Sequence, residues 1–170
     1  MKKLSSLIIA LFVLSAGTVF AQTNVNVTAE VLAELNVTAT DVSFGNVQQG
    51  SVAEVQANTD DAIASNNASD PVSGSLFVEA GNQDYIVEVT QSAILTDVDG
   101  NNPLNFTHRV YLADINVTGD VDGGGYTVSG GGNQTFDIGG QLEAPTEAGS
   151  YSTDNGGTAQ SLIFEVNYII

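Results

Sequence analysis

Basic side chains are nearly absent from this sequence. Its 170 residues include three Lys and Arg, which are Lys2, Lys3 and Arg109, against 20 Asp and Glu, so the formal net charge is −17. A protein that binds nucleic acid needs several cations to displace counterions from the phosphate backbone. Docking on anionic lipid depends on Lys and Arg in the same way. The shortage of basic residues therefore excludes nucleic acid as a partner and leaves nothing to hold the chain on a charged membrane.

Cysteine and tryptophan are missing altogether, and aromatic residues make up 7% of the chain. Without Cys, no disulfide can stabilise the fold, so the domain depends on core packing or on assembly with neighbours. The scarcity of aromatic residues argues against the aromatic-lined cleft of a glycoside hydrolase or a sugar-stacking lectin. The sequence also lacks the G-x-S-x-G motif of serine hydrolases. These absences predict a protein that is not an enzyme.

The N-terminus has the pattern of a secretory signal peptide. Lys2 and Lys3 precede the apolar run 7–14, and Ala21 supplies the small residue that signal peptidase requires. We therefore predict a signal peptide at 1–21 and one domain at 22–170, exported to the periplasm, the cell surface or the extracellular space. Removal of the two lysines lowers the formal net charge from −17 to −19. No other apolar stretch approaches the ~20 residues of a membrane-spanning helix, so we expect no membrane insertion.

A long alternating segment follows the predicted signal peptide. Every odd position from Val25 to Ala39 is apolar, and every even position is polar except Leu32. A period of two predicts a strand with one buried face. At ~3.3 Å per residue the segment would extend about 50 Å, which is far longer than a usual strand. Such a strand must bend, switch sheets or reach beyond its own domain.

Shorter alternating segments occupy the rest of the chain, separated by turn-forming Gly, Asn and Asp residues. No window of about ten residues after the signal peptide shows helical periodicity. The sequence therefore predicts an all-β chain, folded as a single antiparallel Ig-like or pilin-like β-sandwich of about 8 to 10 strands. The expected strands are 51–57, 75–80, 85–90, 104–112, 134–142, a short strand near Tyr151, and 162–170.

The tetrapeptide Asp-Val-Asp-Gly occurs twice, at 97–100 and at 120–123. Alternate Asp carboxylates that end in a glycine resemble the beginning of an oxygen-ligand loop for calcium. The spacing is not that of an EF-hand, because the glycine comes fourth rather than sixth. The simpler interpretation is two hairpin turns, since Asp-Gly is a strong turn signal. The candidate metal ligands are Asp97, Asp99, Asp120 and Asp122; we expect no cofactor beyond weak calcium binding at these residues.

His108 and Arg109 are neighbours on the expected strand 104–112. Alternation places His108 on the same face as Phe106 and Val110, so we expect a hydrogen-bonded histidine in the core. Arg109 is expected to face outwards. There it would pair with a carboxylate in an exposed contact worth roughly 0–1 kcal/mol.

Several short segments follow one another in a recognisable order. They are Val42-Ser43-Phe44-Gly45, Tyr85-Ile86-Val87-Glu88-Val89, Phe136-Asp137-Ile138-Gly139-Gly140-Gln141-Leu142, Ala148-Gly149-Ser150-Tyr151 and Phe164-Glu165-Val166-Asn167-Tyr168. In this order they resemble a family of secreted bacterial domains of unknown function that is similar to pilin-like and spore-coat-like β-sandwich proteins. The resemblance spans about residues 24–168 and implies an exported structural or adhesive protein without catalytic residues. The chain departs from chaperone-assembled pilins in having no disulfide.

Two functions fit these observations. The first is an exported, non-enzymatic surface or fimbria-like structural subunit, whose overlong alternating segment adds a strand to a sheet edge of another copy or of another surface subunit. The second is an extracellular module that binds calcium or a polysaccharide through the loops of 97–132. Ordered loops with converging carboxylates would favour the second function.

Overall fold

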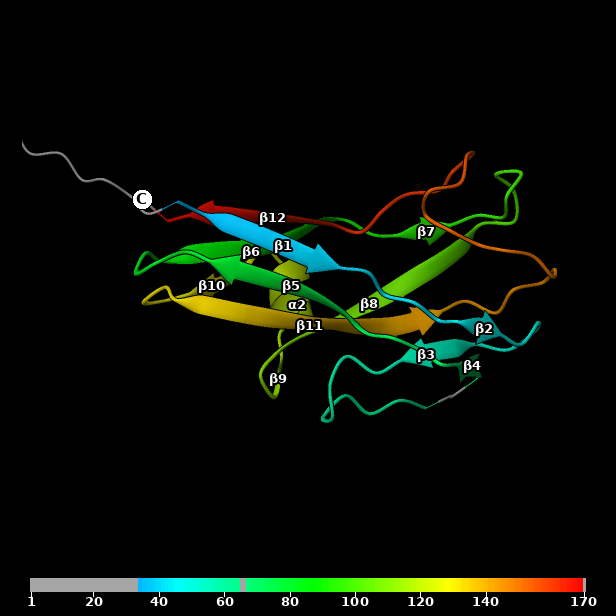
Figure 1. Cartoon of the computed structure of the whole chain (residues 1–170), viewed down its shortest axis with the longest axis horizontal. Helices are drawn as coiled ribbons and strands as arrows, with labels where there is room; N and C mark the ends of the chain where they lie inside the picture. Colours follow the sequence, from blue (N-terminus) through cyan, green and yellow to red (C-terminus); the bar gives the residue numbers. More distant parts are fainter. Residues whose placement is uncertain (1–33, 65–66, 170) are drawn as a thin grey trace, which may run out of the picture. The chain divides into compact units, whose positions relative to one another are not determined.

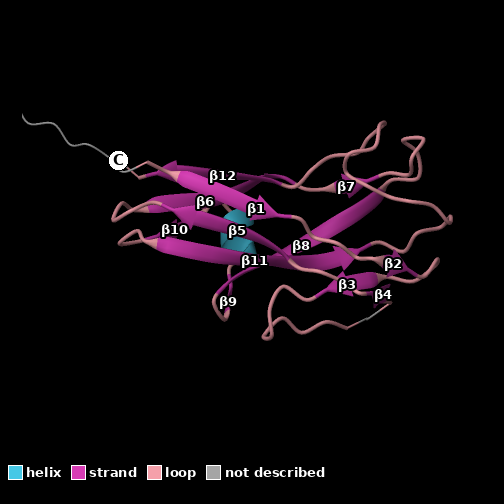
Figure 2. Ribbon diagram, viewed as in Figure 1, coloured by secondary structure: helices cyan, strands magenta, loops and turns pink. Residues whose placement is uncertain are grey.

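The computed structural model describes residues 34–64 and 67–169, which belong to one unit, Leu32–Ile170. The predicted signal peptide and residues 25–33 of the alternating segment lie outside the described residues, and the domain limits of 22–170 stay a prediction. The described part contains twelve strands and one short helix, α2 (Figure 2). All strand pairs are antiparallel except for one isolated parallel bridge. The predicted all-β class is therefore confirmed. Within this part of the chain, no helix has the length and apolar character needed to cross a membrane.

The largest sheet has seven strands and is built around β11 and β8 (Figure 1). Its main path runs β1-β5-β11-β8-β7, with β3 added to β11 and β9 added to β8. The strands are β1 (Asn36–Thr40), β3 (Ala53–Val55), β5 (Gly74–Glu79), β7 (Ile94–Leu95), β8 (Leu104–Leu112), β9 (Ile115–Asn116) and β11 (Asn133–Leu142).

A three-stranded sheet, in the order β10-β6-β12, supplies the other side of the main core. It consists of β10 (Tyr126–Val128), β6 (Tyr85–Gln91) and β12 (Ile163–Tyr168), and a separate pair is formed by β2 (Asn46–Val47) and β4 (Ala68–Ser69). The helix α2 (Thr118–Asp122) packs against β6 and β8.

The main hydrophobic cluster takes side chains from both larger sheets. Leu76, Val78 and Phe136 come from the seven-stranded sheet, while Tyr85 and Val87 come from the three-stranded sheet. Alternation explains this arrangement, because each strand turns every second side chain to the same face. The apolar faces predicted by the alternation of 85–90 and 162–170 are confirmed as far as residue 168, since Val89, Leu162, Phe164, Val166 and Tyr168 all pack on this cluster, while Ile170 lies outside the described residues.

Three local predictions are wrong. The expected strand near Tyr151 is reduced to one isolated bridge between Thr96 and Ser152. The 120–123 tetrapeptide is not a hairpin turn, because Asp120–Asp122 belongs to α2 and Gly123 caps its C-terminus. The strand count is also higher than expected, since four of the twelve described strands are only two residues long.

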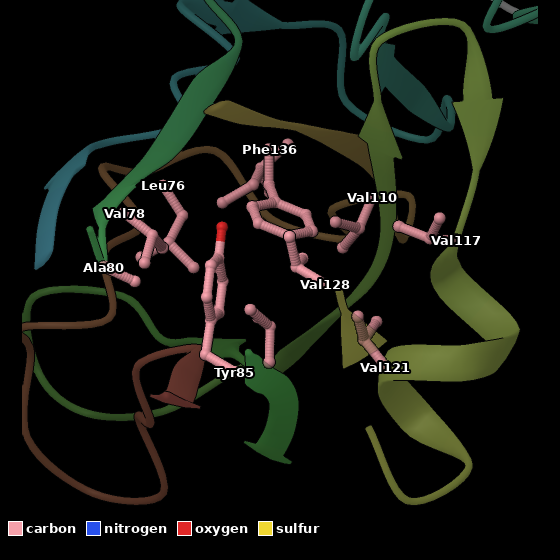
Figure 3. Close-up of a cluster of buried hydrophobic side chains, with 11 residues drawn as sticks. Leu76, Val78, Ala80, Tyr85, Val110, Val117, Val121, Val128 and Phe136 are labelled. Atoms are coloured by element: carbon pink, nitrogen blue, oxygen red, sulfur yellow. The ribbon is translucent and has the colours of Figure 1, made fainter. Parts of the chain in front are cut away.

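Tyr85 carries an unusual polar group into the main cluster. Figure 3 shows its hydroxyl pointing between Leu76 and Phe136. Among the described residues it is the one buried side-chain N or O atom without a hydrogen-bond partner. Burial raises the pKa of Tyr85 to about 12. A buried donor without a partner costs stability, so this hydroxyl opposes folding.

We expect the Tyr85→Phe variant to be more stable than the wild type by about 1 kcal/mol at neutral pH, because the unpaired hydroxyl is removed. The difference in stability between the variant and the wild type should grow as the pH rises from the usual tyrosine pKa to about 12. In that range the unfolded tyrosine ionises and the folded one does not, so wild-type stability falls as the pH rises. Urea unfolding at neutral and alkaline pH measures both effects. A less stable variant at neutral pH would mean that the hydroxyl has a partner.

Candidate functional site

The inner face of β1 is left uncovered by the described residues. Val37 and Ala39 pair across the sheet with Val78 and Leu76, which are buried in the main cluster. Directly opposed residues of an antiparallel pair lie on the same face of the sheet, so Val37 and Ala39 face the core side. Alternation predicts that they are buried, yet all five residues of β1 are exposed, and Val37 is 39% exposed. Within 34–64 and 67–169, the apolar side of this strand therefore lacks a cover.

A groove of about 840 Å³ begins at this uncovered face. Its lining includes Ala39 of β1, Val42, Phe164 of β12, and Ile138 and Phe106 from the large sheet. Further apolar lining comes from Phe44, Val47, Ala93, Leu95, Leu104, Leu142, Ala148, Tyr151 and Leu162. Many of these side chains belong to or pack on the second hydrophobic cluster, which surrounds Phe44 and Phe106. The groove thus exposes apolar surface that an additional strand beside β1 would bury.

Two strand edges border the groove. β1 ends the seven-stranded sheet and pairs only with β5, while β12 ends the three-stranded sheet and pairs only with β6, among the strands of 34–64 and 67–169. The groove lining includes residues from both strands. An edge strand presents backbone N–H and C=O groups that can pair with another chain. Neither edge carries a lysine, one of the common guards against such pairing.

The rim of the groove is acidic. Asp41, Glu147 and Asp154 line it, and no Lys or Arg does so within the described residues. Tyr151 also lies in the wall and donates a hydrogen bond from its hydroxyl to the Glu147 carbonyl oxygen at 3.1 Å. Burial, together with the nearby charges of Asp97 and Glu147, raises the pKa of Tyr151. The groove therefore offers no counter-charge to an acidic segment, while its lining offers apolar contacts.

Asp97 organises the turn between β7 and β8. Its Oδ1 accepts hydrogen bonds from the N–H groups of Asn101 at 2.8 Å and Asp99 at 3.0 Å, and its Oδ2 accepts one from the Asn102 side chain at 2.8 Å. The bond from Asn101, helped by those from Asn102 and Asp99, lowers the pKa of Asp97 despite partial desolvation. The hairpin-turn interpretation holds for this tetrapeptide. The carboxylate is engaged in shaping the turn.

Asp120 and Asp122 lie on α2, away from any hairpin. Asp122 Oδ1 is 2.8 Å from Nε2 of His108, which is 7% exposed. The expectation of a buried, hydrogen-bonded histidine is thereby confirmed. Within the described part of the chain, no three or more His, Cys, Asp or Glu side chains gather closely enough to hold a metal ion. The structure thus does not bring the four candidate aspartates together as one site, and calcium binding stays a prediction.

The prediction that Arg109 pairs with a carboxylate is confirmed, but the prediction of an exposed contact is wrong. Its guanidinium is 20% exposed and contacts Glu54 Oε1 at 2.5 Å and Asp61 Oδ1 at 2.7 Å, and these two acids are 4% and 2% exposed. Burial lowers the pKa of Arg109, but the hydrogen bonds and charges of Asp61 and Glu54 more than offset this, so its pKa is raised. Arg109 is the centre of a buried ion cluster and not a surface contact.

The groove is the candidate functional feature that the sequence pattern missed. Its signal was the length of the alternating segment, which is too long for one strand of one sheet. No protein-family model matches this chain, and no curated protein matches it either, so the resemblance to secreted pilin-like domains stays a prediction.

Proposed function

We propose that this protein is an exported, non-enzymatic structural subunit that assembles by strand addition between copies. The two larger sheets would form an Ig-like, pilin-like β-sandwich that lacks one strand on the side of β1 and β12. The observation that supports the proposal is the apolar groove between two unpaired edges, with Val37 and Ala39 exposed on a core-facing side. Filling this gap completes both sheets.

The alternating N-terminal segment has the composition needed to fill such a groove. Val25, Val27 and Val31 share one face, and Asn26 and Glu30 share the other. Full burial of a valine contributes about 1.5–3 kcal/mol, and the strand backbone adds hydrogen bonds to the open edges. Because the segment and the rim are both acidic and the chain carries a net charge of −17, repulsion between copies opposes assembly. We therefore expect salt to favour assembly by screening this repulsion.

The test compares two variants of the secreted chain in which only one face of the segment is changed. In the first, Val25, Val27 and Val31 are replaced by Ser. In the matched control, Asn26 and Thr28 become Ser and Glu30 becomes Gln, which leaves the apolar face intact. Sedimentation velocity and multi-angle light scattering measure mass across the micromolar range.

We expect the wild type and the control to form oligomers and the apolar-face variant to remain a monomer with the same circular dichroism spectrum. A wild-type protein that stays monomeric at every salt concentration contradicts strand addition. Oligomers of the apolar-face variant equal to those of the wild type contradict it too.

A further inference from the structure

A second cavity lies around His108, on the side of β8 where α2 packs. It has a volume of about 450 Å³, which is within the range of small-molecule sites. Its lining comes from four parts of the chain: the segment 92–94, residues 105–108, α2 and Gln160. It shares Ala93 and Phe106 with the groove lining but takes its polar groups from other residues.

His108 is held in one orientation within this cavity. Its Nε2 is 2.8 Å from Asp122 Oδ1, and in the neutral imidazole we assign the proton to Nε2, because a carboxylate oxygen accepts. The helix that carries Asp122 is itself fixed to the strand, because Thr118 Oγ1 accepts a hydrogen bond from the Val110 N–H at 2.8 Å. A carboxylate that holds one ring nitrogen sets the tautomer of the other. Nδ1 is therefore an acceptor.

The other ring nitrogen of His108, Nδ1, is not fully enclosed by the described residues. It has no hydrogen-bond partner among the described residues. If it were fully buried it would be an unsatisfied atom, but among these residues the Tyr85 hydroxyl is the one such atom. Nδ1 is thus not fully buried although the whole side chain is 7% exposed, and His108 lines the cavity. A positioned acceptor in the lining of a cavity can accept a hydrogen bond from a ligand hydroxyl.

The other groups of the lining restrict the ligand further. Asp122 is 44% exposed and adds a carboxylate acceptor, while Ser92, Thr107 and Gln160 add hydroxyl and amide groups. Ala93, Ile94 and Phe106 supply apolar surface. Among the described residues no Lys or Arg lines the cavity, and Arg109 is engaged with Glu54 and Asp61, so these residues offer an anionic ligand no basic side chain. A neutral sugar fits this lining, because its hydroxyl groups can donate to and accept from the polar side chains while its ring contacts the apolar ones.

We propose that this cavity binds a neutral saccharide of one or two rings, with ligand hydroxyls donating to His108 Nδ1 and to Asp122. The inference does not rest on strand addition. The proposed site also differs from the calcium or polysaccharide loops expected from sequence, because it lies at the junction of β8 and α2.

The experiment titrates the ¹⁵N-labelled full chain with cellobiose, maltose and chitobiose while amide shifts are recorded. We expect at least one disaccharide to shift the amides of 105–108 and 118–122. The key variant is His108→Gln, whose side-chain amide can still donate to Asp122 but offers no acceptor where Nδ1 was. It should bind about tenfold more weakly with an unchanged melting temperature, the loss expected for one hydrogen bond.

Thr127→Ala serves as the control, because Thr127 is exposed on β10 and does not line the cavity. It should bind like the wild type. Gln160→Ala, an exposed position that contacts the ligand in this proposal, gives a second weakened variant if His108→Gln does not fold. The proposal is overturned if none of the three sugars shifts the amides around His108. Equal affinity of the wild type and the folded variants overturns it as well.

Discussion

Replacement of Arg109 by Met is expected to lower the free energy of unfolding by about 3 kcal/mol or more. Arg109 is the partner of two carboxylates, Glu54 and Asp61, that are 4% and 2% exposed. Removing one member of a buried ion cluster leaves uncompensated charge in a place that water reaches poorly, which costs about 3–5 kcal/mol. The partial exposure of Arg109 places the expected value at the lower end. Urea unfolding at neutral pH measures it.

The same residue also holds the segment 56–64 against the large sheet. Arg109 donates to the Ala62 carbonyl, Asp61 accepts a hydrogen bond from the Ala57 N–H at 2.8 Å, and Glu54 accepts one from the Ala64 N–H. Loss of Arg109 therefore leaves both carboxylates bound to backbone but drives them apart. We expect amide hydrogen exchange in 56–64 to rise in Arg109→Met more than in β6.

Two controls separate charge from packing. Arg109→Lys keeps the charge but cannot contact both acids with one planar group, so it should be intermediate. The triple variant Arg109→Met, Glu54→Gln, Asp61→Asn removes all three charges and should recover most of the loss. If Arg109→Met costs less than about 1 kcal/mol, the contact behaves as an exposed ion pair and the buried cluster is not the source of stability.

The contrast between Arg109 and its strand shows what local pattern can and cannot predict. Alternation predicted the limits of β8, 104–112, because a period of two is a property of consecutive residues. It also placed Arg109 on the face away from Val110. It did not predict what covers that face, since Asp61 and Glu54 are 48 and 55 residues away in sequence. Partners at that distance depend on topology.

The same reasoning explains the groove and α2. The pattern of 36–39 predicts an apolar face, but only the sheet order shows that β1 is an edge strand whose face is left open. The five residues of α2 include Gly119 and two Asp, which favour turns over helix. The helix forms there because Val121 is buried in the main cluster and Thr118 bonds to Val110. Tertiary contacts overrode the local preference at both places.

Neighbouring strands approach β11 closely at its two glycines. Residues 139–140 break the alternation of this strand at the point where β11 pairs with β8 on one side and β3 on the other. Gly140 has φ +146°, and a Cβ there would lie 2.2 Å from the Thr107 carbonyl oxygen. A side chain is thus opposed by its own backbone conformation and by the neighbouring strand.

We expect Gly140→Ala to lose about 3 kcal/mol or more of unfolding free energy, because backbone strain and overpacking each cost about 1–3 kcal/mol. The matched control is Gly119→Ala, which adds the same methyl group in open space at a helical position. It should be neutral or up to about 1 kcal/mol more stable, since Ala favours helix over Gly. Thermal and urea unfolding of the two variants side by side give the comparison.

Because His108 lies directly opposite Gly140 in the register, the displaced strand should also shift the His108 ring resonances. Equal stability of the two variants would show that β8 and β11 can separate at this point without cost, and the close approach of the strands would then not explain the glycine.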